Sequence, residues 1–448
     1  MTQKDRPRTK EDVLRLAEEQ HIRFILLQFT DILGVVKSVA VPVEQLPKAL
    51  DGQILFDGSS VHGFVRIEES DMLLKPDPTT YASFPWLNGA RENTARLICD
   101  IYTPNDEPFA GCPRLTLKRA IAEARSLGYS MNAGAEAEFF LFHLDEQGRP
   151  TVKTQDQGSY FDLSPVDTGE NARRDMVIAL QDLGFEIEAA HHEVGPAQHE
   201  IDTRYAEALK AADDVVTLRL VVRTVALQHN LHATFMPKPI HGIPGSGMHV
   251  HQSLFKGDTN VFYDKDGQFQ LSNVCLSYLG GLLKHARGFT AITNPLVNSY
   301  KRLVPGYEAP VYVAWSERNR SPLIRVPARR GISTRLELRS PDPACNPYLA
   351  LAVSLQAGLD GIKNKIPAPP PVNRNIYEMD QNDRESYGIG SLPGSIEEAI
   401  EELMKDEVVC AALGEHIVSR FVDAKRIETD VYRTQVHQWE LDQYLRVY

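Results

Sequence analysis

Hydrophobic and polar positions follow two periods along the chain, and the first part of the pattern predicts a small mixed domain. Residues 9–20 have helical spacing, with Thr9 as the N-cap and Asp12 as its capping-box partner. Strand-like patterns follow at 22–29, 34–43 and 96–102. The segment 103–113 is rich in proline, glycine and polar residues, so we place a domain boundary there.

Beyond this boundary, helical and strand patterns alternate and predict one large domain. We therefore expect two domains, over 1–107 and 108–448. Helices are expected at 115–127, 171–183, 213–228, 274–292 and 350–363. Strands are expected at 136–142, 185–190 and 231–236. The total of 448 residues agrees with this division, because a single core rarely grows beyond about 250–300 residues.

The most informative strand begins with two acids, Glu136 and Glu138, and continues into the apolar run 139–142. Side chains two residues apart on a strand point to the same face. The two carboxylates would therefore project together beside an apolar wall, where their like charges favour a bound cation. An edge strand with a solvated acidic face is the alternative interpretation.

Composition narrows the class of protein. The net charge of -12 argues against a protein that binds nucleic acid by neutralising phosphates. The five cysteines are scattered without a CxxC motif, which is typical of a reducing compartment. We see no signal peptide and no apolar run near the about 18 residues of a membrane span. We therefore expect a soluble, cytoplasmic protein without direct contact to membranes.

Histidines and acids gather in two further stretches. In the stretch 191–200, Glu193 and Glu200 could both reach a cation, but a zinc-protease helix is excluded because Pro196 stands where its second histidine would be. In the stretch 245–253, a glycine loop enters a strand that would carry His249 and His251 on one face. A histidine of this kind is more often a buried structural residue, and the glycines alone are a weak phosphate signal.

Basic residues gather later in the chain. They are Lys301, Arg302, Arg318, Arg320 and Arg325, followed by a strand on which Arg335, Glu337 and Arg339 share a face. Alternating signs of this kind can hold a cation and an anion together, although a structural salt-bridge ladder has the same pattern. The polar segment 55–60 near the N-terminal end is either a ligand-binding loop or a plain turn.

Taken together, these groups favour a metal-dependent enzyme. Oxygen ligands with a single histidine suit Mg²⁺ or Mn²⁺ rather than zinc. Several carboxylates could hold two or more ions, as needed to neutralise a nucleotide triphosphate during phosphoryl transfer. Arginines would bind the phosphoryl group and a carboxylate substrate through paired hydrogen bonds. The chain has no Walker A motif.

These motifs, in this order, resemble the bacterial type I glutamine synthetases from residue 22 to residue 448. The resemblance rests on seven segments: Phe56-Asp57-Gly58-Ser59-Ser60, Glu136-Ala137-Glu138-Phe139, 192–200, Gly245-Ser246-Gly247-Met248-His249, 298–308, Asn319-Arg320-Ser321 and Leu336-Glu337-Leu338-Arg339. It implies an α+β fold, with a small β-grasp-like N-terminal domain and a large catalytic domain. The catalytic domain would be a curved antiparallel sheet flanked by helices.

The resemblance also implies a reaction and a role for each matching residue. The reaction is the ATP-dependent ligation of ammonia to L-glutamate through a γ-glutamyl phosphate, used in nitrogen assimilation. The ligands of the first Mg²⁺ or Mn²⁺ would be Glu138, Glu193 and Glu200, and those of the second would be Glu136, His249 and Glu337. Glutamate would be bound by Gly245, Arg302, Glu308 and Arg339. ATP would be bound by Tyr205, His251, Ser253, Arg320 and Arg325.

Ammonium would be bound and deprotonated by acids that belong to two subunits. Glu308 matches a flap residue that closes the site, whereas Asp57 and Ser60 would act on a neighbouring subunit. Asp57, Glu308 and Arg320 are thus the expected catalytic residues. The family assembles as a dodecamer of two hexameric rings, and its C-terminal arm is exchanged between rings. On the residues alone, the aromatic tail 431–448 is either a partner-binding arm or disordered.

Two features concern the subclass. The segment 375–380 resembles a loop that carries an adenylylated tyrosine, here Tyr377, but the chain is shorter than that subclass. It therefore resembles the non-adenylylated, feedback-inhibited alpha subclass, in which Arg66 would help to sense glutamine. A transcription-factor partner is compatible with this subclass.

One departure from the family concerns the substrate. Pro244 stands where the family usually has asparagine, and proline offers neither a side-chain amide nor a backbone N–H. The alternatives to glutamine synthesis are a paralogue that ligates glutamate to another amine and a non-catalytic regulatory assembly.

Overall fold

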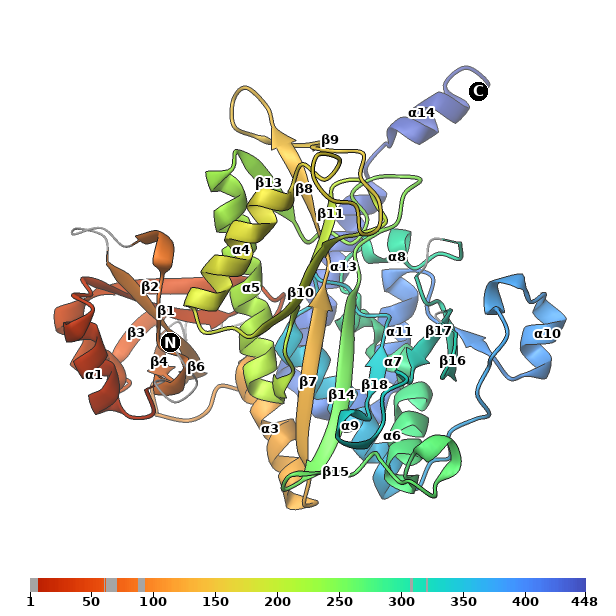
Figure 1. Ribbon diagram of the computed structural model, residues 1–448, viewed down its shortest axis with the longest axis horizontal. Coiled ribbons are helices and arrows are strands. Elements are labelled where there is room, and N and C mark those ends of the chain that lie inside the picture. The colour runs from red at the N-terminus through yellow and green to blue at the C-terminus, as the bar shows by residue number, and fades with distance from the viewer. Residues whose placement is uncertain (1–6, 60, 62–70, 88–92, 307–308, 320) are drawn as a thin grey trace.

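The N-terminal domain is a small twisted sheet with helices on one side (Figure 1). The computed structural model describes residues 7–59, 61, 71–87, 93–306, 309–319 and 321–448. Within them, the sheet has the order β2-β1-β6-β4-β3, with the short β5 beside β6 and with β1 and β6 parallel. Its elements are α1 (Lys10–Glu19), β1 (Phe24–Thr30), β2 (Val36–Pro42), α2 (Leu46–Leu50), β3 (Ile54–Asp57), β4 (Asp71–Pro76), β5 (Ala82–Ser83) and β6 (Thr94–Tyr102).

Local sequence signals explain how this domain begins. Thr9 accepts a hydrogen bond from the N–H of Asp12, and the Asp12 carboxylate accepts one from the N–H of Thr9, so the predicted capping box is confirmed. The predicted polar loop 55–60 is partly wrong, because residues up to Asp57 form β3 and pair with β4. The domain has a core of its own around Ile25, Leu97 and Leu74.

The catalytic domain is built on one large and mostly antiparallel sheet. Among the described residues, its main path runs β13-β8-β11-β7-β14-β18-β17-β16-β19. Its strands are β7 (Ser130–Ala137), β8 (Phe139–Leu144), β9 (Pro150–Thr154), β10 (Ile187–His192), β11 (Gln198–Thr203), β12 (Ala206–Glu207), β13 (Leu231–Thr234), β14 (Met248–Lys256), β15 (Thr259–Asn260), β16 (Tyr312–Ser316), β17 (Pro322–Arg325), β18 (Leu336–Leu338) and β19 (Gly390–Ser391).

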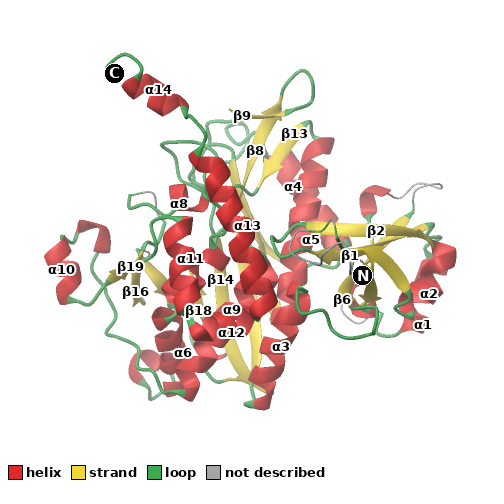
Figure 2. Cartoon of the chain, turned by 180° about the vertical axis from the view of Figure 1, so that it is seen from behind, coloured by secondary structure: helices red, strands yellow, loops and turns green. Residues whose placement is uncertain are grey.

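Helices cover one face of this sheet (Figure 2). The described helices of the catalytic domain are α3 (Pro113–Ser126), α4 (Glu170–Asp182), α5 (Ala208–Gln228), α6 (Asn273–Lys284), α7 (Ala286–Thr293), α8 (Ser299–Arg302), α9 (Pro347–Lys363), α10 (Gln381–Ser386), α11 (Ile396–Lys405), α12 (Glu407–Leu413), α13 (Glu415–Arg433) and α14 (Gln438–Tyr444), of which α10 and α14 lie away from the sheet. Helix α9 is apolar on all sides and almost entirely buried, so it forms the centre of the helical layer. A Cβ atom on Gly281 would lie 2.1 Å from the carbonyl oxygen of Ala357, so this glycine lets α6 and α9 cross closely. None of the described helices is long and apolar enough to span a membrane.

Two of the expected elements are interrupted. The single strand predicted at 136–142 is wrong, because β7 ends at Ala137 and β8 begins at Phe139. Both strands pair with β11, but on their other edges β7 pairs with β14 and β8 pairs with β13, and Glu138 lies at the change. The single helix predicted at 274–292 is also wrong, because it divides into α6 and α7 at His285, whose ring nitrogens lie 2.7 Å from Asp406 and 2.9 Å from Asp360.

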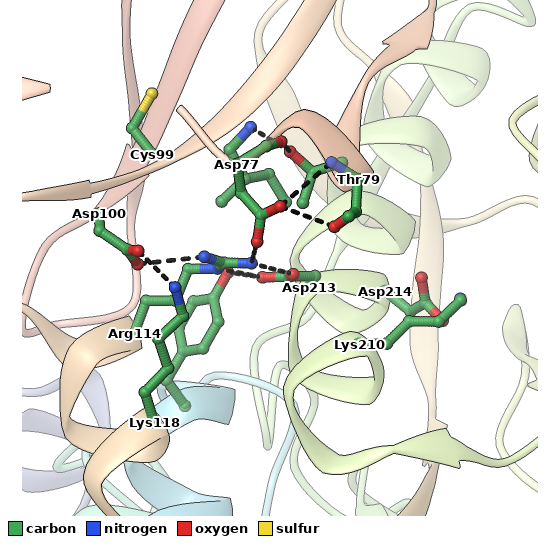
Figure 3. A network of polar contacts seen from close by, with 12 residues as sticks. Asp77, Thr79, Cys99, Asp100, Arg114, Lys118, Lys210, Asp213 and Asp214 are labelled. Carbon is green, nitrogen blue, oxygen red and sulfur yellow. Dashed lines mark hydrogen bonds and ion pairs between the residues drawn. The ribbon is translucent and has the colours of Figure 1, made fainter. Parts of the chain in front are cut away.

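The two domains are joined by a buried arginine (Figure 3). Arg114, at the start of α3, is 3% exposed and lies 2.8 Å from Asp77, 3.0 Å from Asp100 and 2.9 Å from Asp213. Asp77 and Asp100 belong to the N-terminal domain, whereas Asp213 lies on α5. Asp213 also accepts a hydrogen bond of 2.6 Å from the Tyr348 hydroxyl. We call Arg114 and these three aspartates the Arg114 cluster.

The C-terminal end leaves the body of the molecule. Helix α13 packs on the catalytic domain, but α14 projects away from it in both views (Figures 1 and 2). Its large apolar side chains are uncovered, with Trp439 62% exposed and Leu445 73% exposed. The tail is therefore helical, and nothing in the described part of the chain covers it.

Candidate active site

Three neighbouring strands of the catalytic sheet bring two acids and a histidine together. Glu136 on β7 lies opposite His249 on β14, and Glu337 lies on the next strand, β18. His249 Nδ1 is 3.4 Å from Glu136 Oε2 and 3.7 Å from Glu337 Oε1. One ligand atom from each residue lies within 4.8 Å of the others, as a metal ion requires. We call these three residues the Glu337 cluster.

Positive charge surrounds the Glu337 cluster. Arg325 Nη1 lies 2.8 Å from Glu337 Oε2, and Arg339 Nη1 lies 2.5 Å from Glu337 Oε1. Burial opposes ionisation of Glu337, but His249 and Arg339 outweigh it and lower the pKa of this carboxyl. Glu337 is therefore a carboxylate at neutral pH, available to a cation while it is held in place by arginines.

A second group of acids lies beside the first. It contains Glu138, at the change between β7 and β8, Glu193, directly after β10, and Glu200 on β11. In the described part of the chain, no lysine or arginine forms an ion pair with any of these three, although His191 lies between two of them. Its Nε2 atom is 2.9 Å from Glu193 Oε1 and 3.9 Å from Glu200 Oε1. We call Glu138, Glu193 and Glu200 the Glu200 cluster.

The environment of the Glu200 cluster disfavours the ionised form of its carboxyl groups. Burial, strengthened by the charge of Glu193, raises the pKa of Glu138 to about 8. Burial and the charge of Glu138 also raise the pKa of Glu200. An arrangement of buried acids without an internal cation is stabilised when an external cation binds.

The residues expected to bind glutamate adjoin both clusters. Arg302 donates to the carbonyl oxygen of Ser340 at 2.7 Å and is 4% exposed. A Cβ atom on Gly247 would lie 2.5 Å from Arg302 Nη2, and one on Gly245 would lie 2.3 Å from the carbonyl oxygen of Pro237. These two positions therefore need glycine, because the backbone runs directly against the arginine and a neighbouring loop.

A cavity of about 200 Å³ opens beside the Glu337 cluster. It is lined by Tyr205, His251 and Ser253, the three residues expected to contact the nucleotide, and by Glu136. His251 connects the cavity to the cluster, because its Nε2 atom lies 2.7 Å from Glu136 Oε1. A wider cleft of about 690 Å³ between the domains holds charges that are already paired, such as Arg114 with Asp213, and is the weaker candidate.

Of the expected ammonium-site residues, Asp57 lies in the described part of the chain, and it is not part of this arrangement. Asp57 is exposed at the end of β3, in the N-terminal domain, on the far side of α4 and α5 from β14 and β18 (Figure 1). A hydrogen bond from Ser59 lowers its pKa, so it is ionised at neutral pH. The other residues, Ser60, Arg66, Glu308 and Arg320, lie outside the described residues.

The structure adds residues that sequence reasoning did not assign. Gln198 donates to Glu138 Oε2 at 2.8 Å and to the carbonyl oxygen of Gly245 at 3.1 Å, so it joins the Glu200 cluster to the glycine loop. Arg335 donates from Nε to His251 Nδ1 at 3.0 Å. Its place on the alternating 335–339 run was the available signal, whereas nothing in the sequence marked Gln198.

Comparisons with known proteins agree with this geometry. Residues 21–104 match the glutamine synthetase β-grasp domain, and residues 110–444 match the glutamine synthetase catalytic domain. The chain is 58% identical to a glutamine synthetase of Staphylococcus aureus over 98% of its own length and 99% of that protein. It is 56% identical to the enzyme of Staphylococcus epidermidis, with the same coverage.

Solved structures agree as well. A GmaS chain in complex with ADP is 32% identical, with a TM-score of 0.88 over 97% of this chain and 99% of that chain. A Plasmodium falciparum glutamine synthetase determined by cryo-electron microscopy is 26% identical, with a TM-score of 0.86 over 97% and 98%. The expected fold, a β-grasp N-terminal domain on a large catalytic domain, is thereby confirmed. With both of its domains matched and close relatives that share nearly its whole length, this chain belongs to the glutamine synthetase family.

Proposed function

We propose that the chain carries out its family's reaction, the ATP-dependent synthesis of glutamine from glutamate and ammonia, with the two acid clusters as metal sites. The observation that carries the assignment is the convergence of Glu136, His249 and Glu337 within 4.8 Å, beside a cavity lined by His251 and Ser253. Acids, arginines and a cavity of this kind serve phosphoryl transfer to a carboxylate substrate.

The donors fit hard divalent cations. Five carboxylates and a single histidine favour Mg²⁺ or Mn²⁺ over zinc, and the raised pKa of Glu138 reflects a cluster that lacks its own cation. Glu138, Glu193 and Glu200 would hold the first ion, and the Glu337 cluster would hold the second. When bound, the ions supply positive charge that neutralises the triphosphate during transfer.

Glutamate and ATP would meet between the clusters. Arg302 and Arg339, with the Gly245 backbone, would bind the carboxylates of glutamate, since guanidinium groups match carboxylates with two parallel hydrogen bonds. The position of Arg302 against the glycine loop supports this role. Tyr205, His251 and Ser253 line the cavity proposed for the nucleotide. Arg320 and Arg325 would face its phosphates.

Ammonium would be bound by Asp57 and Ser60 of a neighbouring subunit, and Glu308 would accept its proton and close the site. Ammonia attacks only after deprotonation, so a carboxylate base is needed. The acyl phosphate must also be kept from water. The exposed Asp57 in the N-terminal domain supports a role between subunits. We propose a dodecamer of two hexameric rings, and the uncovered apolar side chains of α14 support exchange of this arm between rings.

We further propose the alpha subclass, with glutamine feedback sensed in part by Arg66 and with a transcription factor as a possible regulatory partner. The alternative, modification of Tyr377, is disfavoured because its hydroxyl donates to the carbonyl oxygen of Ala309 at 2.7 Å. This partly buried hydrogen bond would have to break before the tyrosine could react.

Pro244 makes the choice of amine the sharpest test. Purified protein with Mg²⁺, ATP and glutamate should release phosphate when ammonium is added, and glutamine should form in equal amount. Methylamine and ethylamine should give much slower release. The close relatives favour this outcome over ligation of another amine.

Variants of the loop before Gly245 complete the test. Pro244→Asn should change the KM for glutamate, whereas Pro239→Asn, in the same loop, should leave it unchanged. Turnover with another amine only would identify a paralogous ligase. Lack of turnover with every amine, in an assembled oligomer, would refute the catalytic assignment and leave a regulatory assembly.

A further inference from the structure

A buried cluster of two histidines and two aspartates lies directly behind the Glu200 cluster. Asp156, Asp167, His192 and His199 each place one side-chain oxygen or nitrogen within 4.8 Å of the others. All four are buried, and both histidines are completely inaccessible to solvent. We call them the His–Asp cluster. The proposed mechanism does not use any of its members.

The His–Asp cluster is complete without a metal ion. Arg173 Nη1 lies 2.7 Å from Asp167 Oδ2 and 2.7 Å from His199 Nδ1, so a guanidinium group already supplies a cation. Close backbone packing fills the remaining space, since a Cβ atom on Gly158 would lie 2.7 Å from His192 Nε2. An ion would have to displace both, so the cluster has another role.

The two histidines frame the turn that carries two proposed metal ligands. His192 ends β10 and pairs with His199 on β11, and Glu193 and Glu200 follow them directly in the sequence. Neighbouring residues on a strand point to opposite faces, so the histidines are buried behind the acids. The positions of the acids therefore depend on how this turn is held.

Asp156 holds the turn at both of its ends. Its Oδ1 atom lies 3.1 Å from His192 Nε2 and accepts a hydrogen bond of 2.9 Å from the N–H of Ala197. The other ring nitrogen of His192, Nδ1, lies 2.6 Å from the carbonyl oxygen of Glu193. Because both partners of this ring are acceptors, both of its nitrogens donate. Ala197 has a φ of 60°, a strained conformation for a residue with a side chain, and so needs such support.

The segment that carries Asp156 has no regular secondary structure of its own. It follows β9 and reaches α4 through a loop, so it is placed by its contacts with the turn. The N–H of Phe161 donates to the carbonyl oxygen of His192 at 3.1 Å, and the N–H of Gly158 donates to Asp156 Oδ1 at 3.1 Å. The segment that carries Asp156 and the turn between β10 and β11 therefore hold each other in place.

We propose that Asp156 is a positioning residue, which acts through His192 and Ala197 to keep Glu193 and Glu200 in the geometry that binds the first metal ion. This inference rests on the proposed function, because it takes the Glu200 cluster as that metal site. Partners of this kind, which hold a ligand without touching the metal, typically contribute about 10-fold to 100-fold in metal affinity.

Mn²⁺ binding measured by electron paramagnetic resonance tests the proposal on the full-length protein. The Glu337→Gln background weakens the second site, so the remaining tight Mn²⁺ reports the first one. In this background Asp156→Ala should raise the Kd for Mn²⁺ by about 10-fold or more. Asp156→Asn keeps an acceptor oxygen for His192 and Ala197, so it should recover most of that affinity.

Asp145, in the turn between β8 and β9, provides a matched control. Asp145 also accepts backbone hydrogen bonds in a turn, from Gln147 and Arg149, but it touches neither cluster. Asp145→Ala should leave the Kd unchanged. In the otherwise unaltered enzyme, Asp156→Ala should raise the Mg²⁺ concentration needed for half-maximal activity, while kcat recovers at saturating Mg²⁺.

The outcomes separate this inference from the proposed function. Unaltered protein that binds no Mn²⁺ would refute the metal-site assignment and this inference with it. Equal affinity in the Asp156→Ala and unaltered proteins would overturn the inference alone, as would equal weakening of both sites. If Asp156→Ala does not fold, Asp156→Ser decides, because its shorter side chain cannot reach both His192 and Ala197, and a Kd equal to that of an Asp145→Ser control would overturn the proposal.

Discussion

Two of the buried acid groups described above, the Arg114 cluster and the Glu200 cluster, differ in how their charge is neutralised. In the Arg114 cluster, one guanidinium group lies within 3.0 Å of three aspartates, and Lys118 pairs with one of them (Figure 3). Burial opposes ionisation of Asp77, but Arg114 lowers its pKa below the usual value. In the Glu200 cluster no lysine or arginine within the described chain forms an ion pair, and the pKa of Glu138 is raised to about 8.

The difference identifies what each group does. Acids that carry their own cation hold two domains together and have no need of a ligand. Acids that lack one are costly to the folded protein and are retained where a cation binds from outside. The Glu337 cluster is intermediate, because arginines hold its Glu337 while Glu136 lines the cavity.

The largest effect is expected from removing the internal cation. Arg114→Met would leave buried aspartates without a partner, so we expect the free energy of unfolding to fall by about 3–5 kcal/mol. Urea unfolding measures it. Arg149→Met removes an arginine whose ion pair with Asp145 is exposed, and it should unfold like the parent. Equal stability of the Arg114→Met protein would show that the cluster does not hold the domains.

Neutralising an acid of the Glu200 cluster should have the opposite effect, because activity should fall while stability is kept. Glu200→Gln should lower kcat/KM by at least about 100-fold, because it removes a proposed metal ligand. The metal-free variant should be as stable as the parent or more so, since the raised pKa of Glu200 shows that the folded protein favours its neutral form. Glu186→Gln, an exposed change beside β10, is the control for both measurements. Full activity of Glu200→Gln would remove this residue from the metal site.

The pH dependence of stability should distinguish the two groups. The pKa of Glu138 rises from 4.5 to about 8, so its contribution to stability is complete below pH 4.5 and is lost as the pH rises through about 8. In EDTA the thermal midpoint should therefore fall between pH 6 and pH 9, and Mn²⁺ should restore it most strongly at the alkaline end. Glu138→Gln should lessen this fall in the thermal midpoint. The comparison distinguishes the titration of Glu138 from that of the histidines. A midpoint that is independent of pH would contradict this account.

The smallest effect is expected at the rim of the Arg114 cluster. Lys118 is 34% exposed on its side chain, so its ion pair with Asp100 is partly screened by water. Lys118→Met should cost less than about 1 kcal/mol in urea unfolding, with less effect at high salt. A loss of unfolding free energy as large as that of Arg114→Met would mean that Lys118 and Arg114 contribute equally to the stability of the cluster.

Local sequence signals predicted the structural features that depend on contacts between residues close in sequence. The capping box of α1 is such a case, because Thr9 and Asp12 contact each other within one helical turn. The break at His285 could not be foreseen, since it depends on Asp360 and Asp406, which lie 75 and 121 residues away. The break at Glu138 likewise depends on partner strands that are distant in sequence.

The residues of the candidate site likewise differ in whether the sequence could predict them. Glu136, His249 and Glu337 could be named from their motifs, and the structure brings them together. Gln198 and Asp156 carry no pattern, because their importance comes from contacts that only the folded sheet creates.

The order of strands in the sheet also affects how the protein is made. The N-terminal domain is complete once β6 has been synthesised, so it can fold while the rest of the chain is still on the ribosome. The Glu337 cluster needs β7, β14 and β18 side by side, and β18 follows the other two along the chain by a long interval. Until β18 emerges, a nascent chain carries the other acids on an open sheet edge and cannot bind its second cation.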